Sequence, residues 1–421
     1  MKRRIWFGTA VVAAYLAYVI VIVVFFSRYE ANAVPASLVG GPADPATFMT
    51  EEQLQEAQQL SRIRYLSTFI LTPLDWLLLF LFLLTGLSAA FRRRAEALFK
   101  RSFPRVAVYF LLFQILATAV RLPIQFGFYR LDVRYGLSDQ PVGSWFSDQG
   151  LVLLVNTLIM LPVVWLAYWV VCRSPKRWWL WGWISYVPVL LFVHFIQPVV
   201  LDPLFNQYQP LRDEALRQEI MALVEEADVP IEHVVEADMS KQTNRISAHV
   251  AGFGATSRVV LWDTALKQVD RDGILFLVAH EVGHYVKRHI LWFLVVKIVL
   301  VFVTFRIVYE LYRWAVRRWS GPMKLTGAGD MAALPIILLF FMLVGFVLSP
   351  VEMAVIRMQE QSADEYALEL TGDGEAGVRL MQAVVTSSLS DVNLPWIYHF
   401  FYGSHPEPME RIVYMSGHSD E

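Results

Sequence analysis

The stretch VAHEVGH at residues 278–284 has the form HExxH and lies in a run, residues 274–286, whose apolar spacing is helical. On a helix, His280 and His284 stand on one face, close enough to hold one zinc ion, and Glu281 faces the same open side. A catalytic zinc takes nitrogen and carboxylate ligands and keeps one position for water, whose proton a neighbouring carboxylate can accept. The stretch is typical of metalloproteases, although so short a pattern also arises by chance.

The composition indicates a membrane protein. Of 421 residues, 56% are hydrophobic and only 18% are charged, and the mean hydropathy is +0.45, whereas soluble domains are about a quarter charged. The net charge of -2 gives no reason to expect a nucleic-acid partner, because such partners select strongly basic surfaces. The single Cys172 excludes an intramolecular disulfide framework and a multi-cysteine zinc site. Histidines and carboxylates must therefore hold any metal.

Apolar runs long enough to cross a bilayer recur along the chain. A helix needs about 20 apolar residues to span the hydrocarbon core. Seven runs reach this length, at residues 5–26, 66–91, 106–128, 151–171, 178–200, 291–312 and 331–356. The first run is interpreted as a retained anchor and not as a signal peptide cleaved near residues 31–33, because it is longer than the apolar core of a signal peptide.

These runs divide the chain into a membrane region with five transmembrane helices, a water-facing module that includes the HExxH helix, two further transmembrane helices and a C-terminal segment. The four parts are residues 1–200, 201–290, 291–356 and 357–421. Within the module, residues 214–226 predict an amphipathic helix, and residues 234–236 and 259–262 predict strands. The predicted fold class is mainly α, a polytopic membrane protein with about seven transmembrane helices and a small α+β metallopeptidase module.

The HExxH helix needs a third metal ligand, and Glu360 in the C-terminal segment is the best candidate. In one class of zinc protease, a glutamate on a later helix supplies this ligand. Glu360 and Asp364 share a helical face through their four-residue spacing, so Glu360 could bind the metal while Asp364 orients a ligand or the substrate. Alternatively, these two residues form an ordinary solvated acidic face with Glu352 and Glu365. Spacing alone does not separate the two interpretations.

Three segments together give the chain a resemblance to a known family. HEVGH at 280–284, EQSAD at 360–364 and HPEPMERI at 405–412 resemble, in sequence, order and separation, the type I CAAX prenyl endopeptidases and the related HtpX-type membrane peptidases. PLFN at 203–206 and RVVLWDT at 258–264 extend the similarity, which runs from about residue 200 to 415. The membrane region matches more loosely.

The resemblance implies a zinc endopeptidase whose seven helices wall an intramembrane chamber, with the metal facing its interior. It implies that His280, His284 and Glu360 hold one Zn²⁺ per chain and that Glu281 activates the water. The hydrolysis needs no organic cofactor.

The resemblance also gives roles to three further residues. It implies that Asp364 is a catalytic or ligand-orienting acid, and that His405 and Arg411 contact the scissile carbonyl or the developing oxyanion. The chain departs from the family at residues 247–249, which read Ser-Ala-His where Asn-Ala-Tyr is common. His249 therefore either replaces the tyrosine as a donor or is a neutral surface histidine.

The expected substrates are extended polypeptides, among them prenylated (CAAX-type) or membrane-associated chains. Such a peptide would pair with an edge strand near residues 250–254. The alternatives are a protease for membrane-protein quality control and, from another class, a non-catalytic receptor or transporter with a structural zinc. Glu281 argues against the last, because a structural site has no use for a base. The expected partners are a peptide or protein substrate and membrane lipids, and the oligomeric state stays open.

Polar and ionisable residues within the apolar runs predict a hydrated cavity, because such groups usually face a bundle interior. They are Asp75, Arg121, Asn156, His194, Lys297 and Arg306. For each residue taken singly, snorkelling, pairing or a local hydrogen bond is the alternative. His289, five residues beyond His284, falls off the zinc face and is interpreted as structural.

Basic residues cluster at residues 2–4, 92–101, 173–177 and 313–324, which all fall on one side of a seven-span topology. The positive-inside rule makes that side cytoplasmic. The module and the C-terminal segment are therefore expected on the outer or periplasmic side, whereas the eukaryotic members of the family are expected to face the cytosol.

Overall fold

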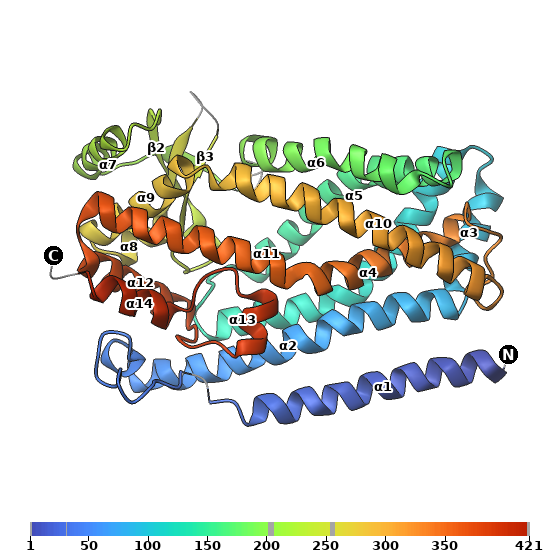
Figure 1. The fold of residues 1–421 in the computed structure, drawn as a ribbon, viewed down its shortest axis with the longest axis horizontal. Helices are drawn as coiled ribbons and strands as arrows, with labels where there is room; N and C mark the ends of the chain where they lie inside the picture. Colours follow the sequence, from blue (N-terminus) through green and yellow to red (C-terminus); the bar gives the residue numbers. More distant parts are fainter. Residues whose placement is uncertain (1, 31, 201–205, 253–256, 419–421) are drawn as a thin grey trace.

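Seven long helices follow the apolar runs and set the shape of the protein (Figure 1). The computed structural model describes residues 2–30, 32–200, 206–252 and 257–418. The long helices are α1 (Lys2–Ser27), α2 (Glu51–Leu84), α4 (Ser102–Arg134), α5 (Val142–Arg173), α6 (Trp178–Val200), α10 (His289–Met323) and α11 (Leu334–Thr371). Six of them are long and apolar enough to cross a membrane, and α6 has a shorter apolar stretch in its described part. The prediction of a mainly helical, multi-span membrane protein is confirmed.

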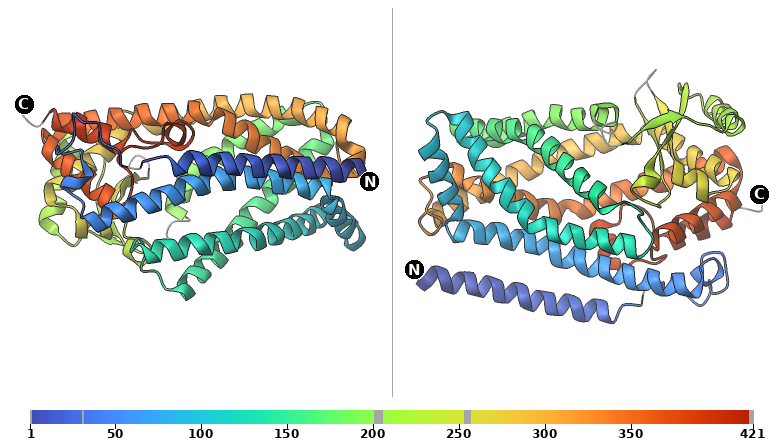
Figure 2. Two further views of the ribbon diagram at one scale, coloured as in Figure 1. Left: turned by 90° about the horizontal axis from the view of Figure 1, so that it is seen from below. Right: turned by 180° about the vertical axis from the view of Figure 1, so that it is seen from behind.

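The long helices form a ring. Neighbouring helices pack in the order α2, α11, α10, α6, α5 and α4, and α1 packs outside the ring against α2, as Figure 2 shows from two further sides. Arg121 of α4 lies 2.9 Å from Asp75 of α2 and closes the ring between these helices. The most apolar stretch of α5 contains no buried residue. The described side chains therefore leave this stretch of α5 accessible.

The second expected span differs from the structure at both ends. α2 begins at Glu51, where Thr50 and Gln53 form a reciprocal capping box, so the helix starts well before the apolar run at residues 66–91. α2 ends at Leu84, before Gly86 takes a left-handed backbone (φ 81°). This turn starts a separate amphipathic helix, α3 (Leu87–Leu98). A helix boundary of this kind depends on a single turn residue, which apolar run length does not detect.

The module stands at the end of the bundle opposite the N-terminus (Figure 1). Its sheet has the order β1 (Tyr208–Pro210), β2 (His233–Ala237), β4 (Arg258–Trp262) and β3 (Ala248–Ala251), with β2 and β4 parallel and the outer pairs antiparallel. It is accompanied by α7 (Glu214–Glu226), α8 (Asp263–Gln268) and α9 (Arg271–Val286). β3 is the edge strand, as expected, although residues 253 and 254 of the predicted peptide-binding edge lie outside the described residues, as do 203–205 of the PLFN segment and residue 31.

α11 continues without a break from the far end of the bundle to the module and passes through the domain boundary expected at residues 356 and 357. It packs closely against α9 because Gly283 has no side chain: a Cβ there would lie 3.1 Å from the ring of Tyr366 and 3.3 Å from Cα of Ala363. The chain then forms α12 (Gly374–Ser388), α13 (Trp396–Tyr402) and α14 (Pro408–Ser416). The described residues also contain three short 3-10 helices, at Pro45–Thr47, Met239–Lys241 and Met331–Ala333.

The four charged residues predicted within the apolar runs are paired. Besides Asp75 and Arg121, Lys297 of α10 lies 2.5 Å from Glu352 of α11. Arg306 lies 2.6 Å from Glu310. The N-terminus, α3, the α5–α6 turn and the α10–α11 connection, which carry the four basic clusters, lie at the end of the bundle farthest from the module (Figure 1).

Candidate metal centre

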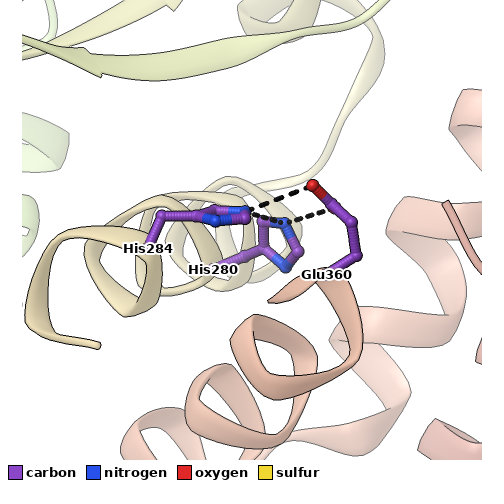
Figure 3. A group of neighbouring side chains, drawn as sticks. All are labelled: His280, His284 and Glu360. Carbon is purple, nitrogen blue, oxygen red and sulfur yellow. Dashed lines mark hydrogen bonds and ion pairs between the residues drawn. The ribbon is translucent and has the colours of Figure 1, made fainter. Parts of the chain in front are cut away.

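Three side chains from two helices converge where α11 passes α9 (Figure 3). His280 and His284 come from consecutive turns of α9, and Glu360 comes from α11. Nε2 of His280 and Nε2 of His284 lie 3.2 Å apart, and each lies near one oxygen of Glu360, at 3.3 and 3.5 Å. The candidate ligand atoms of all three residues lie within 4.8 Å of one another.

These distances fit a tetrahedral metal. Two ligand atoms about 2.0–2.1 Å from a tetrahedral zinc lie roughly 3.3 Å apart, and the observed separations are 3.2, 3.3 and 3.5 Å. Oε2 of Glu360 is buried, and although Nε2 of His280 and Nε2 of His405 each lie 3.3 Å from it, neither makes a well-aligned hydrogen bond to it. An unpaired buried carboxylate oxygen is costly, and a cation between it and the two nitrogens would satisfy all three lone pairs. The donor set therefore suits a metal ion.

Burial excludes the solvated acidic face for two of the four acidic residues. The exposed fraction is 8% for Glu360 and 2% for Asp364. Oδ1 of Asp364 lies 2.8 Å from Nδ1 of His280, an arrangement that favours a proton on Nδ1 and leaves Nε2 free as a ligand. Glu352 pairs with Lys297 instead.

Arg411 of α14 holds the carboxylate of Asp364. Its Nε and Nη2 donate hydrogen bonds to the two oxygens at 2.7 and 2.6 Å. This bidentate geometry fixes the guanidinium plane relative to the carboxylate plane. The resemblance implies that Arg411 contacts the scissile carbonyl or the developing oxyanion. In the structure, its Nε and Nη2 donate to Asp364 instead. A chain of contacts runs from Arg411 through Asp364 to His280.

The second imidazole also has a partner for Nδ1. Nδ1 of His284 lies 2.9 Å from Nδ1 of His289. The chain turns between the two residues, because Arg288 takes a left-handed backbone (φ 55°) and His289 begins α10. His289 is not one of the three candidate metal ligands, in keeping with its interpretation as structural, but its ring contacts Nδ1 of His284. The signal for this contact in the sequence was a further histidine, His289, five residues after the last histidine of HExxH.

The three polar residues of the HExxH stretch, His280, Glu281 and His284, have pKa values shifted in different ways by their surroundings. Burial opposes protonation of His280, but the neighbouring Asp364 and Glu360 outweigh it and raise the pKa of His280 to about 9. Burial and the neighbouring His280 lower the pKa of His284 to about 4. Burial, supported by Glu360, raises the pKa of Glu281 to about 7. The site therefore attracts positive charge, keeps one imidazole neutral, and holds a carboxyl whose pKa suits proton transfer near neutral pH.

His405 lies at the open side of the site, in the loop between α13 and α14. Its Nε2 is 3.3 Å from Oε2 of Glu360, and its side chain is 56% exposed. The hydroxyl of Ser404 lies 2.9 Å from its Nδ1. Of the residues assigned to the site from the sequence, His405 is the most accessible to a bound peptide. His249 lies on the edge strand β3, opposite Val260 of β4.

Comparison with known proteins agrees with this geometry. Residues 210–418 match peptidase family M48, and residues 36–207 match the CAAX prenyl protease N-terminal region with five membrane helices. The chain is 37% identical over 97% of its length to a metalloprotease of Bacillus subtilis, YhfN, described as uncharacterised, of which it covers 96%. It is 28% identical to CAAX prenyl protease 1 of Saccharomyces cerevisiae, over 72% of this chain and 70% of that protein.

The fold has a counterpart among solved structures. The crystal structure of Ste24p from S. mikatae superposes with a TM-score of 0.80 over 97% of both chains, at 20% sequence identity. This likeness extends the family resemblance of the catalytic segments to the helical ring. The chain therefore belongs to peptidase family M48, with the CAAX prenyl protease type of membrane region, and is a membrane-embedded metalloprotease.

Proposed function

We propose that this protein is a zinc-dependent endopeptidase in which His280, His284 and Glu360 hold one ion and Glu281 is the general base. The observation that supports this most is the convergence of two Nε2 atoms on a buried glutamate whose Oε2 accepts no well-aligned hydrogen bond from the described residues. Nitrogen and carboxylate donors without cysteine are typical of catalytic zinc sites.

A metal ion held there would supply Lewis acidity, which makes water acidic near neutral pH and polarises a peptide carbonyl. Glu281 accepts a proton from the attacking water and delivers it to the nitrogen of the leaving amine. Asp364 and Arg411 keep His280 in the orientation that presents Nε2. His405, on the accessible side, donates to the carbonyl oxygen as negative charge develops there.

The proposed substrates are extended polypeptides, including prenylated or membrane-associated ones. Among the described strands β3 stands at the edge of the sheet, where a peptide could pair with its backbone, which gives affinity with little sequence demand. The yeast relative is a CAAX prenyl protease, and this supports lipid-modified substrates. A quality-control role on misfolded membrane proteins uses the same chemistry and is the second candidate, because backbone pairing at β3 demands little of the substrate sequence.

We also propose that the N-terminus is cytoplasmic and that the metal centre faces the outer or periplasmic side. All four basic clusters lie at the end of the bundle opposite the module, and positive charge marks the cytoplasmic end. An alkaline phosphatase fused to the C-terminus, which is active only outside the cytoplasm, should be active. If the phosphatase fusion is inactive and a green fluorescent protein fused to the C-terminus is fluorescent, the C-terminus is cytoplasmic and the proposed orientation is wrong.

The test of the catalytic proposal is Glu281→Gln in the full-length protein reconstituted in vesicles. Bound zinc, measured by elemental analysis, should stay at one per chain, while cleavage of an unstructured peptide falls about 10²–10⁴-fold, the usual worth of a general base. Equal cleavage by both forms would remove Glu281 from the mechanism. The same peptide with and without a farnesyl group, compared by kcat/KM, separates a preference for lipid-modified substrates from general proteolysis.

A further inference from the structure

We infer that His289 is a positioning residue for the metal centre: its Nδ1 accepts a hydrogen bond from Nδ1 of His284 and so fixes the tautomer in which Nε2 of His284 binds metal. This inference rests on the proposed function, because it concerns the same ion. It starts from one distance, 2.9 Å between the two Nδ1 atoms.

The direction of this hydrogen bond follows from the position of His284. Nε2 of His284 faces Nε2 of His280 and an oxygen of Glu360, so Nε2 is the metal-facing atom and must carry no proton when it binds. A neutral imidazole then has its single proton on Nδ1. The atom 2.9 Å away must therefore be an acceptor, and His289 supplies one by leaving its own Nδ1 unprotonated.

The fold holds His289 in the place where it can do this. The left-handed Arg288 ends α9 and turns the chain, so His289 starts α10 with its side chain against the preceding helix. His289 is only 7% exposed. Its carbonyl oxygen accepts a hydrogen bond of 3.1 Å from the side chain of Gln359, the neighbour of Glu360 on α11.

His289 therefore contacts both ligand-bearing helices, α9 through its ring and α11 through its backbone. The two imidazoles of the site are supported by different chemistry: His280 by a carboxylate held by Arg411, and His284 by a neutral ring. A neutral acceptor adds no negative charge beside the metal, so the arrangement limits the charge of the centre. Outer partners of this kind are worth about 10–100-fold in metal affinity.

The experiment compares two substitutions at one position. His289→Asn keeps an acceptor, because Oδ1 of asparagine can take the place of Nδ1, whereas His289→Leu removes it. Each full-length variant is stripped of metal, and its Zn²⁺ affinity is measured by competition with a chelating dye. The visible absorption of the Co²⁺-loaded forms reports the ligand field without reference to activity. His418→Leu, near the C-terminus, is the matched histidine control.

We expect His289→Leu to bind Zn²⁺ about 10–100-fold more weakly than the wild type and to show altered cobalt bands. His289→Asn and His418→Leu should stay within about threefold of the wild type. If His289→Leu keeps wild-type affinity and spectrum, or if Asn is as damaging as Leu, the positioning role is refuted while the zinc site itself stands. If the wild type and Glu360→Ala bind Zn²⁺ equally weakly, the proposed zinc site fails and the inference fails with it.

Discussion

Arg411 and Asp364 are joined by two parallel hydrogen bonds, Nε to Oδ2 at 2.7 Å and Nη2 to Oδ1 at 2.6 Å, although 47 residues separate them in the chain. Both side chains are buried, with exposed fractions of 13% and 3%. Asp364 in turn faces Nδ1 of His280. The pair therefore links the C-terminal helix α14 to the metal-facing ring of α9.

Arg411→Lys should weaken metal binding more than it weakens the fold. Lysine keeps the positive charge but cannot form the bidentate geometry, so Asp364 loses its fixed orientation and Zn²⁺ affinity should fall about 10–100-fold. Arg411→Met leaves Asp364 buried without a cation and should cost roughly 3–5 kcal/mol of stability. Dye competition and thermal unfolding measure the two effects. Wild-type affinity in Arg411→Lys would show that Asp364 does not need its partner.

Glu360→Ala should lower metal affinity by more than about 100-fold, because a direct ligand is worth more than the outer partners that contribute 10–100-fold. Elemental analysis after dialysis against a weak chelator measures the retained metal. Glu365→Ala, on the same helix, is the control and should keep its metal. Retention of both metal and activity by Glu360→Ala would require another third ligand.

His405→Ala should retain metal and lose turnover. Its ring is half-exposed beside Glu360 and is proposed to donate to the developing oxyanion, and loss of one such donor costs about 10²–10³-fold in kcat. Steady-state kinetics on an unstructured peptide separates kcat from KM. A change confined to KM would assign His405 to peptide binding.

Asp391 predicts a pH-dependent contribution to stability outside the metal centre. Burial raises the pKa of Asp391, against the hydrogen bonds that it accepts from the Tyr29 hydroxyl at 2.7 Å and the backbone of Asn32 at 2.6 Å. A carboxyl with a raised folded pKa stabilises most below its unfolded value of about 3.9, and this contribution is lost as the pH rises through the folded pKa.

Asp391→Asn should therefore melt at a higher temperature than the wild type at pH 7, and the gap should close toward pH 4. The amide imitates the protonated acid and removes the cost of burying the charge. Comparing both proteins in metal-free form at each pH cancels the other titrating groups. A variant that melts below the wild type at pH 7 would show that the hydrogen bonds outweigh burial.

Local patterns predicted the elements that carry the metal-facing residues. The apolar spacing around HExxH predicts α9, and the structure adds an N-cap at Asp270. The amphipathic pattern at residues 214–226 coincides with α7. Each of the seven apolar runs lies mainly in a different helix, although the second run extends into α3. In each case the helix is predicted from the apolar pattern within one segment, and this pattern can be read from a single sequence.

Long-range contacts and single-residue turns were not predictable in this way. Nothing in HPEPMERI states that Arg411 will donate to Asp364 and not to a substrate, because this depends on how α14 packs. The left-handed Arg288 lies in a stretch without glycine or proline, the usual signals for a turn. The apolar runs 274–286 and 291–312 lie on either side of this turn, but neither run shows that the ring of His289 contacts His284.

The unbroken course of α11 has a consequence for biogenesis. Glu360 is synthesised some 76 residues after His284. It lies in the C-terminal part of α11, the helix whose N-terminal part is the last apolar span to be inserted into the bilayer. A nascent chain that stops before this last insertion carries two imidazoles and no acid to complete them. With Glu360 as the third ligand, as proposed, a complete metal site requires that the last long helix is in place.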